Sequence, residues 1–199
     1  MPVSIKTFPI AVFAAVAFLL AACETPSPTP VYPEVSFRHL PKLKLDVAAI
    51  DVRQTYVPPL KAPNVEHQFP LTPSDAARRW IDDRLAAAGS NGVATVIIQD
   101  ASAIEEKLRT QGGIRGAFTT EQSERYVARM TVRLEVSNAG GLGSGFAAAS
   151  AARSRTVPED ATLNERDKAF FELTEGLVQD FDRAMEKEIN DNLRGFLVN

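Results

Sequence analysis

The sequence predicts an α+β fold, a two-layer sandwich in which about four mostly antiparallel strands carry two helices on one face. Three segments support this class. Every even-numbered residue of 126–136 is apolar, which is the two-residue period of a half-buried strand. Residues 72–89 and 162–196 repeat apolar side chains every three or four positions, as amphipathic helices do. The expected order is strand, helix, strand, strand, strand, helix.

The first strand is expected over residues 43–56. Its apolar residues change phase midway, from odd positions such as Leu45 to even positions such as Val52. One extra residue near Ala48 and Ala49 would keep a single inward face, which is what a β-bulge does. The segment therefore predicts one bulged strand.

Both helices have local start signals. Residues 72–75 place a threonine cap before a proline, and a negative charge follows three residues after the cap. Gly89 is expected to end this helix. Thr162 and Glu165 match the capping box, and the apolar stripe behind them continues to Phe196.

Three further segments complete the fold. The apolar run 93–99 follows a glycine-containing turn and predicts a buried central strand. Residues 103–110 are expected to form a short helix. Residues 146–157 are expected to form a strand whose small side chains would let a helix lie close. That segment is rich in alanine, so a helix remains the alternative.

Composition is that of an ordinary, mildly acidic domain. The formal net charge is −3, and no basic stripe is present, so nucleic acid is not an expected partner. Residues 43–199 are enough for a single domain with its own core. Because the chain has one cysteine, it cannot form an internal disulfide, and that core must stabilise the domain alone.

The first 22 residues have the pattern of a secretory signal. Lys6 gives a basic start, and residues 8–22 carry no charge. A membrane span needs about 20 apolar residues, which exceeds this run. We therefore predict a signal peptide over residues 1–22, with an uncleaved anchor as the alternative.

The tetrapeptide Leu20-Ala21-Ala22-Cys23 at the end of that run resembles the lipobox of bacterial lipoproteins. In that family the signal is cut before the cysteine, whose sulfur carries diacylglycerol. The resemblance implies lipidation of Cys23, a covalent lipid in place of any cofactor, and a membrane as partner. The next residue is Glu24 and not aspartate, which implies the outer membrane rather than the inner, with the domain facing the periplasm. A buried thiol is the alternative.

Residues 23–42 are predicted to form a tether. Prolines recur through this stretch, and such segments extend as polyproline II at about 3.1 Å per residue. Fully extended, the tether would reach on the order of 50 Å and lift the domain 43–199 off the headgroups. A proline-rich ligand for a partner domain is the alternative.

Arginines provide the candidate binding site. Arg125, Arg129 and Arg133 lie on the outward side of the strand 126–136, and Arg153 and Arg155 lie on the expected neighbouring strand. Together they predict a basic sheet face for acidic headgroups, lipopolysaccharide phosphate or an acidic protein surface. Ordinary cross-strand pairing with nearby glutamates is the alternative.

No catalytic constellation is expected. His39 and His67 have no neighbouring ligands at metal-binding spacing, so no metal site is predicted. The glycine-rich stretch 141–145 lacks the first glycine of the nucleophile elbow. Trp80, the single tryptophan, is interpreted as a core residue, with a ligand-stacking pocket between sheet and helices as the alternative.

The element order behind a lipobox and a proline tether resembles a loose group of Gram-negative envelope lipoproteins. That group includes the lipopolysaccharide-assembly lipoprotein and the auxiliary lipoproteins of ABC-type lipid transporters. The resemblance implies a non-catalytic accessory that binds an envelope protein or lipid. A periplasmic small-molecule or lipid-binding protein is the alternative, and a hydrolase is a further one.

Overall fold

The computed structural model describes residues 31–108, 122–138 and 143–198. The chain divides into two units, Met1–Val31 and Tyr32–Asn199, and all of the described helices and strands belong to the second. Cys23 and the predicted signal peptide lie outside the described residues.

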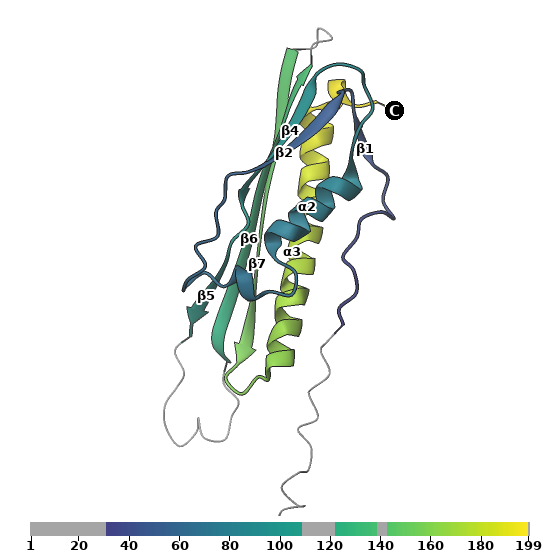
Figure 1. The fold of residues 1–199 in the computed structure, drawn as a ribbon. Helices are drawn as coiled ribbons and strands as arrows, with labels where there is room; N and C mark the ends of the chain where they lie inside the picture. Colours follow the sequence, from purple (N-terminus) through teal and green to yellow (C-terminus); the bar gives the residue numbers. More distant parts are fainter. Residues whose placement is uncertain (1–30, 109–121, 139–142, 199) are drawn as a thin grey trace, which may run out of the picture. The chain divides into compact units, whose positions relative to one another are not determined.

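A mixed sheet forms the first layer (Figure 1). β6 is its central strand: β4 and β5 lie end to end along one edge of β6, and β7 lies along the other, all antiparallel to it. β2 pairs with β4 in parallel and closes that side of the sheet. The five strands are β2 (Ala49–Gln54), β4 (Val93–Asp100), β5 (Ala103–Lys107), β6 (Gln122–Asn138) and β7 (Gly143–Pro158).

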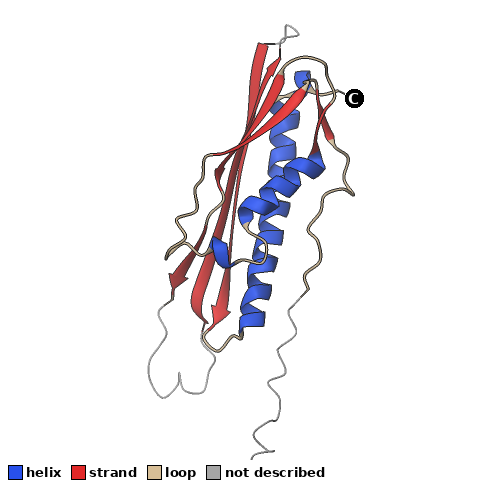
Figure 2. Ribbon diagram, viewed as in Figure 1, coloured by secondary structure: helices blue, strands red, loops and turns tan. Residues whose placement is uncertain are grey.

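Two helices form the second layer and cover one face of this sheet (Figure 2). They are α2 (Pro73–Arg84) and α3 (Leu163–Asn192). The Thr72 side chain caps α2, and Thr162 and Glu165 form the predicted capping box of α3. The predicted α+β class, with both helices on one face, is confirmed.

The alternation of apolar and polar side chains along β6 determines which of its faces packs against the helices. Its even-numbered residues from 126 to 136 are all 2 % exposed or less. On β7 the inward positions are small, with Ala147 and Ala149 buried. A Cβ added to Gly145 would lie 2.8 Å from Leu193 Cδ2, so α3 and the turn after it pack directly on the β7 backbone. Residues 146–157 are a strand, and the helical alternative is wrong.

Residues 43–56 do not form one bulged strand. β1 (Leu43–Leu45) pairs in parallel with β3 (Leu85–Ala87) in a separate two-stranded sheet, while β2 joins the main sheet. Between β1 and β2, the Val47 N–H donates to the Leu45 carbonyl at 2.8 Å, which turns the chain sharply. The change of apolar phase therefore marks a change of sheet and not a bulge.

α2 also ends earlier than predicted, at Arg84 and not at Gly89. The helix ends at this residue because the backbone of residues 85–87 pairs with β1 instead. Gly89 has a different role: a Cβ there would lie 2.2 Å from Asp46 Oδ1. Glycine is needed at this position for the close approach of two chain segments.

The short helix predicted over residues 103–110 is also wrong. Residues 103–107 form β5, and residues 109 and 110 lie outside the described residues. β6 pairs with one edge of β5. The loop between β2 and α2 pairs with the other edge, where the Glu105 N–H donates to the Pro63 carbonyl at 2.8 Å. Backbone partners on both sides override the local helical preference.

The folded unit begins before the predicted tether ends. Val35 and Phe37 are 7 % and 5 % exposed, and the Tyr32 ring stacks on Phe171 with centroids 4.7 Å apart. Residues 32–40 therefore belong to the domain, and the predicted boundary at residue 43 is too late. Apolar side chains between the prolines give this stretch enough surface to bury.

Asp83 of α2 holds residues 36–38 of this N-terminal segment by hydrogen bonds. Its Oδ2 atom accepts hydrogen bonds from the Phe37 N–H at 2.8 Å and the Ser36 hydroxyl at 2.9 Å, and its Oδ1 atom accepts from Arg38 Nε at 3.1 Å. Burial alone would raise the pKa of the Asp83 carboxyl. The three hydrogen bonds and the Arg38 charge outweigh burial and hold that pKa below its usual range.

The Asp83→Asn variant should lose part of the acid sensitivity of folding. Because the pKa of Asp83 is lower in the folded chain, its carboxylate stabilises the fold above about pH 4, and this contribution is lost as the pH falls through the folded-state pKa. Urea unfolding followed by Trp80 fluorescence at pH 7 and pH 3 should show a smaller pH effect in the variant. The exposed neighbour Asp82, changed to Asn, is the control, and equal pH effects in both variants would contradict the assignment.

Candidate functional site

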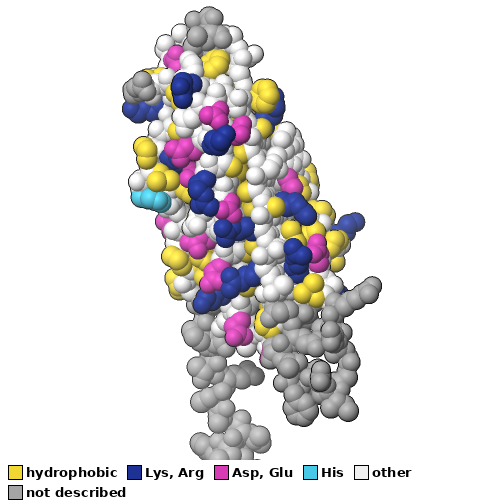
Figure 3. All heavy atoms as spheres, turned by 180° about the vertical axis from the view of Figure 1, so that it is seen from behind, with side chains coloured by type: hydrophobic (Ala, Val, Ile, Leu, Met, Phe, Trp, Pro, Cys, Tyr) yellow, Lys and Arg dark blue, Asp and Glu magenta, His cyan; other side chains and the backbone are white. Residues whose placement is uncertain are grey.

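The sheet face opposite the helices is the candidate functional site. None of the described helices covers it (Figure 2). It presents the odd-numbered residues of β4 and β6 and the even-numbered residues of β7. Seen from behind, this side of the molecule carries basic side chains interspersed with acidic ones (Figure 3). We refer to it below as the open face.

Three of the five predicted arginines share the open face. Arg125, Arg129 and Arg133 alternate with the buried residues of β6, and successive arginines are about 13 Å apart along the strand. Arg133 Nε donates to Glu135 Oε1 at 2.6 Å, and its guanidinium carbon lies 3.8 Å from the ring centroid of Phe146. The geometry is that of a cation–π contact.

Arg153 and Arg155 do not belong to the open face, contrary to the prediction. β7 is in register with β6 so that Arg129 faces Ala152, and the odd-numbered residues of β7 therefore point to the helices. Arg153 forms an ion pair with Asp180 of α3, and Arg155 Nη1 lies 2.6 Å from Glu172 Oε2. These two arginines join the sheet to α3.

Small polar and apolar side chains form the β7 part of the open face. They are exposed and leave the surface flat beside the arginines: Ser144, Ala148, Ser150, Ala152 and Ser154. Phe146 is the exception, a large apolar side chain that is 53 % exposed. Sequence reasoning did not select Phe146, although it is the single aromatic residue in an alanine-rich strand.

Arg129 carries the uncompensated charge of this face. Arg125 Nε lies 3.9 Å from Glu106 Oε2, and Arg133 is paired with Glu135, whereas Arg129 has no ion-pair partner among the described residues. Exposed ion pairs contribute little to stability. Arg125 and Arg133 can therefore exchange their present ion pairs for contacts with a partner.

The open face is hollowed at one end, where β4, β6 and β7 lie side by side. Val93, Thr95, Arg133, Glu135 and Phe146 are among the residues that line a depression of about 570 Å³. Val93 is 37 % exposed there. Phenylalanine and arginine are both enriched in protein–protein interfaces.

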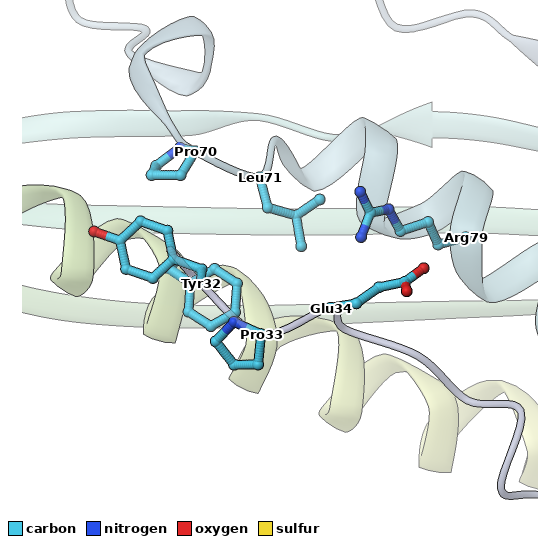
Figure 4. Close-up of a pocket in the computed structure, with 7 residues that line it drawn as sticks. Tyr32, Pro33, Glu34, Pro70, Leu71 and Arg79 are labelled. Atoms are coloured by element: carbon cyan, nitrogen blue, oxygen red, sulfur yellow. The ribbon is translucent and has the colours of Figure 1, made fainter. Parts of the chain in front are cut away.

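A second hollow lies on the helix side (Figure 4). Tyr32 and Glu34 of the N-terminal segment, Leu71 before α2, Arg79 of α2 and Phe171 of α3 take part in its wall. Its volume is about 310 Å³, at the lower limit for a small-molecule pocket. Figure 4 shows Glu34 and Arg79 together at one end and the Tyr32 ring at the other.

Trp80 is a core residue, and the ligand-stacking alternative is wrong. The side chain is 1 % exposed. Its indole N–H donates to Asp182 Oδ1 at 2.7 Å, and its ring meets Phe181 edge-on with centroids 5.0 Å apart. The indole fills the space between α2 and α3 and leaves no ring face for a ligand.

The same Asp182 holds a buried arginine that the sequence did not single out. Arg84 is 0 % exposed, with Nε 2.8 Å from Asp182 Oδ1 and Nη2 2.7 Å from Glu186 Oε2. Its Nη1 atom also donates to the Pro41 carbonyl. Each charge of this cluster has a partner, so the cluster is a structural connection between α2, α3 and the N-terminal segment.

The remaining candidates give no site. His39 and His67 are exposed. Within residues 31–108, 122–138 and 143–198, no group of three His, Cys, Asp or Glu side chains is placed to hold a metal ion. None of the helices in these ranges combines the length and apolarity that crossing a membrane requires.

Comparison with solved structures finds a distant likeness. The crystal structure of protein XCC0632 from Xanthomonas campestris, described as DUF330, aligns with a TM-score of 0.30 and 10% sequence identity over 81% of this chain and 97% of that chain. At this TM-score the likeness carries no argument about function. No family model matches the sequence, and no curated protein matches it.

Removing the buried carboxylate should destabilise the domain strongly. In Asp182→Ala, the Arg84 guanidinium and the Trp80 indole lose their shared acceptor, and breaking a buried ion pair costs about 3–5 kcal/mol. Urea unfolding monitored by Trp80 fluorescence measures the loss. Asp191→Ala, which breaks the exposed pair with Lys187, should leave the midpoint nearly unchanged. Similar midpoints for the two variants would contradict the structural role of Asp182.

Proposed function

We propose that the chain is a lipid-anchored, non-catalytic accessory protein of the bacterial cell envelope that docks a partner protein on its open face. The observation that carries this proposal is the open face itself. It combines Arg129, which has no ion-pair partner among the described residues, with the Arg133–Phe146 contact and a depression lined by both polar and apolar side chains.

The spacing of the arginines favours an extended partner. Arg125 and Arg133 are about 26 Å apart along β6, so one small anion cannot contact both. A protein surface with several carboxylates can, and charge-assisted hydrogen bonds to arginine are among the strongest available to it. The flat β7 strip beside the arginines lets such a surface approach closely.

The anchor is supported by the sequence at the start of the chain. The uncharged run ends at Cys23, and the lipobox resemblance implies acyl chains on that sulfur. Several acyl chains hold a protein on a bilayer far more firmly than one. We place the protein on the outer membrane, facing the periplasm, because Glu24 follows the cysteine.

A small-molecule or lipid-binding function is the second candidate. The observation that favours it is the hollow beside Tyr32, with its apolar wall and its Glu34–Arg79 end. Because this hollow is small, it supports a ligand-binding function less strongly than the open face supports docking of a protein. Lipid recovered with the purified protein in the absence of any protein partner would favour this candidate over docking.

Reversing charge on the open face should abolish partner binding. The double variant Arg129→Glu, Arg133→Glu places carboxylates where the partner is expected to present its own. We expect cross-linking in detergent-solubilised envelopes to lose the partner that wild-type protein captures, while thermal unfolding stays similar because both side chains are outside the core.

The matched control is Arg183→Glu, Lys187→Glu, which makes the same change of charge on the exposed side of α3. It should capture the partner as wild type does. Equal loss in both double variants would point to net charge, and unchanged capture in the first would remove the open face from the proposal.

The Cys23→Ser variant should accumulate as an unlipidated precursor. Serine offers no thiol for diacylglycerol transfer, so metabolic labelling with palmitate should disappear and the apparent mass should rise by the uncut signal. Normal palmitate labelling of this variant would exclude the lipobox interpretation.

A further inference from the structure

The loop between β2 and η1 (Glu66–Gln68) exposes two large apolar side chains. Val57 is 78 % exposed and Leu60 is 65 % exposed, and two prolines separate them. Neither side chain packs in the hydrophobic core. We refer to residues 57–61 as the apolar loop tip.

Leu60 occupies a backbone conformation that leucine disfavours. Its φ angle is +54°, in the left-handed region where a β-carbon meets the following carbonyl oxygen. Glycine would adopt this conformation without that cost. The Leu60 backbone is therefore strained, and burial of its side chain does not compensate for that strain. Backbone strain clusters at functional sites, which makes Leu60 a candidate for a functional contact.

The base of the loop holds its tip in place. The Tyr56 hydroxyl donates to Glu66 Oε1 at 2.7 Å, and Glu66 is only 2 % exposed. The Asn64 N–H donates to the Lys61 carbonyl at 2.9 Å, which closes a turn beneath the tip. A tip that is already ordered loses little entropy when it binds.

The loop lies beside β5, in the half of the domain that contains the N-terminal part of α3. Asn64 pairs with Ile104 of β5, and β5 pairs with the part of β6 that faces residues 153–157 of β7, shortly before α3 begins. In Figure 1, β5 and the first turns of α3 lie in the same half of the domain. Tyr32 stacks on Phe171, early in α3.

We propose that Val57 and Leu60 insert into the headgroup–acyl boundary of the bilayer to which the protein is anchored, with Lys61 at the level of anionic headgroups. The inference rests on the proposed lipid anchor. Residues 53–63 carry two positive charges, on Arg53 and Lys61, and no carboxylate, which suits contact with an anionic surface.

The anchor is necessary for this contact. Two apolar side chains bind a bilayer only weakly by themselves, but a tethered domain stays at high effective concentration beside the surface. The loop contact would then determine which end of the domain faces the membrane, while the acyl chains hold the protein there.

The test uses the full-length lipidated protein in vesicles of phosphatidylethanolamine and phosphatidylglycerol. With Cys23 acylated, Val57→Cys supplies a single free thiol for an environment-sensitive nitrobenzoxadiazole label. We expect its emission to shift to the blue, and brominated acyl chains to quench it while aqueous iodide does not. Ser150→Cys on the open face is the matched control, and its label should remain in water.

A second variant separates insertion from folding. Asparagine tolerates the left-handed conformation, so Leu60→Asn removes the apolar contact without adding strain. We expect it to abolish the blue shift of the label at position 57 while the thermal midpoint stays equal or rises. An unchanged blue shift in this variant would overturn the role of Leu60.

The possible outcomes distinguish failure of membrane insertion by the loop tip from failure of the proposed lipid anchor. A label at position 57 that stays in water on vesicle-bound protein would overturn insertion and leave the anchor intact. A label shielded only after solubilised envelope protein is added would overturn it in favour of a protein pocket. Protein that fails to associate with vesicles at all would overturn the anchor itself.

Discussion

The antiparallel pairing of β6 with β7 is the constraint on which the rest of the structure depends. It runs without a change of register from Glu124 opposite Val157 to Asn138 opposite Gly143. Because side chains alternate along each strand, this register assigns every residue of both strands to one face. It places Gly145 and the inward alanines under α3, so the helix can lie close to the backbone. The same register puts Arg129 beside the small side chains of the open face, and a slip of one residue would exchange the two surfaces.

Charges on the two sides of the sheet have different consequences. On the helix side the charges form ion pairs, Arg84 with Asp182 and Arg153 with Asp180. Such pairs connect elements that are distant in sequence, and the charges within them are already engaged with each other. On the open face the arginines make exposed contacts that cost little to exchange. The Arg84 pair is buried, whereas the Arg153 pair is as exposed as those of the open face and differs from them because it joins β7 to α3.

Local signals predicted most of the fold, and tertiary contacts decided the rest. The alternation of β6 and the caps at Thr72 and Thr162 are properties of neighbouring residues, so the sequence sufficed. β5 could not be predicted, because its conformation comes from backbone partners on β6 and on the loop before α2. The candidate site divides in the same way. Alternation alone placed three arginines on one face, whereas Arg153 and Arg155 required the register of β7.

The depression on the open face and the apolar loop tip lie over different strands, and this separation links the two proposals. The loop leaves the sheet at Tyr56, whose N–H donates to the Ile98 carbonyl, and returns beside β5, where the Glu105 N–H donates to the Pro63 carbonyl. The tip therefore belongs to the edge of the sheet formed by β2 and β5, whereas the depression lies over β4, β6 and β7. Contact of the tip with the bilayer involves none of the residues that line the depression around Phe146. The two proposed contacts can therefore form at the same time, one with the membrane and one with a partner protein.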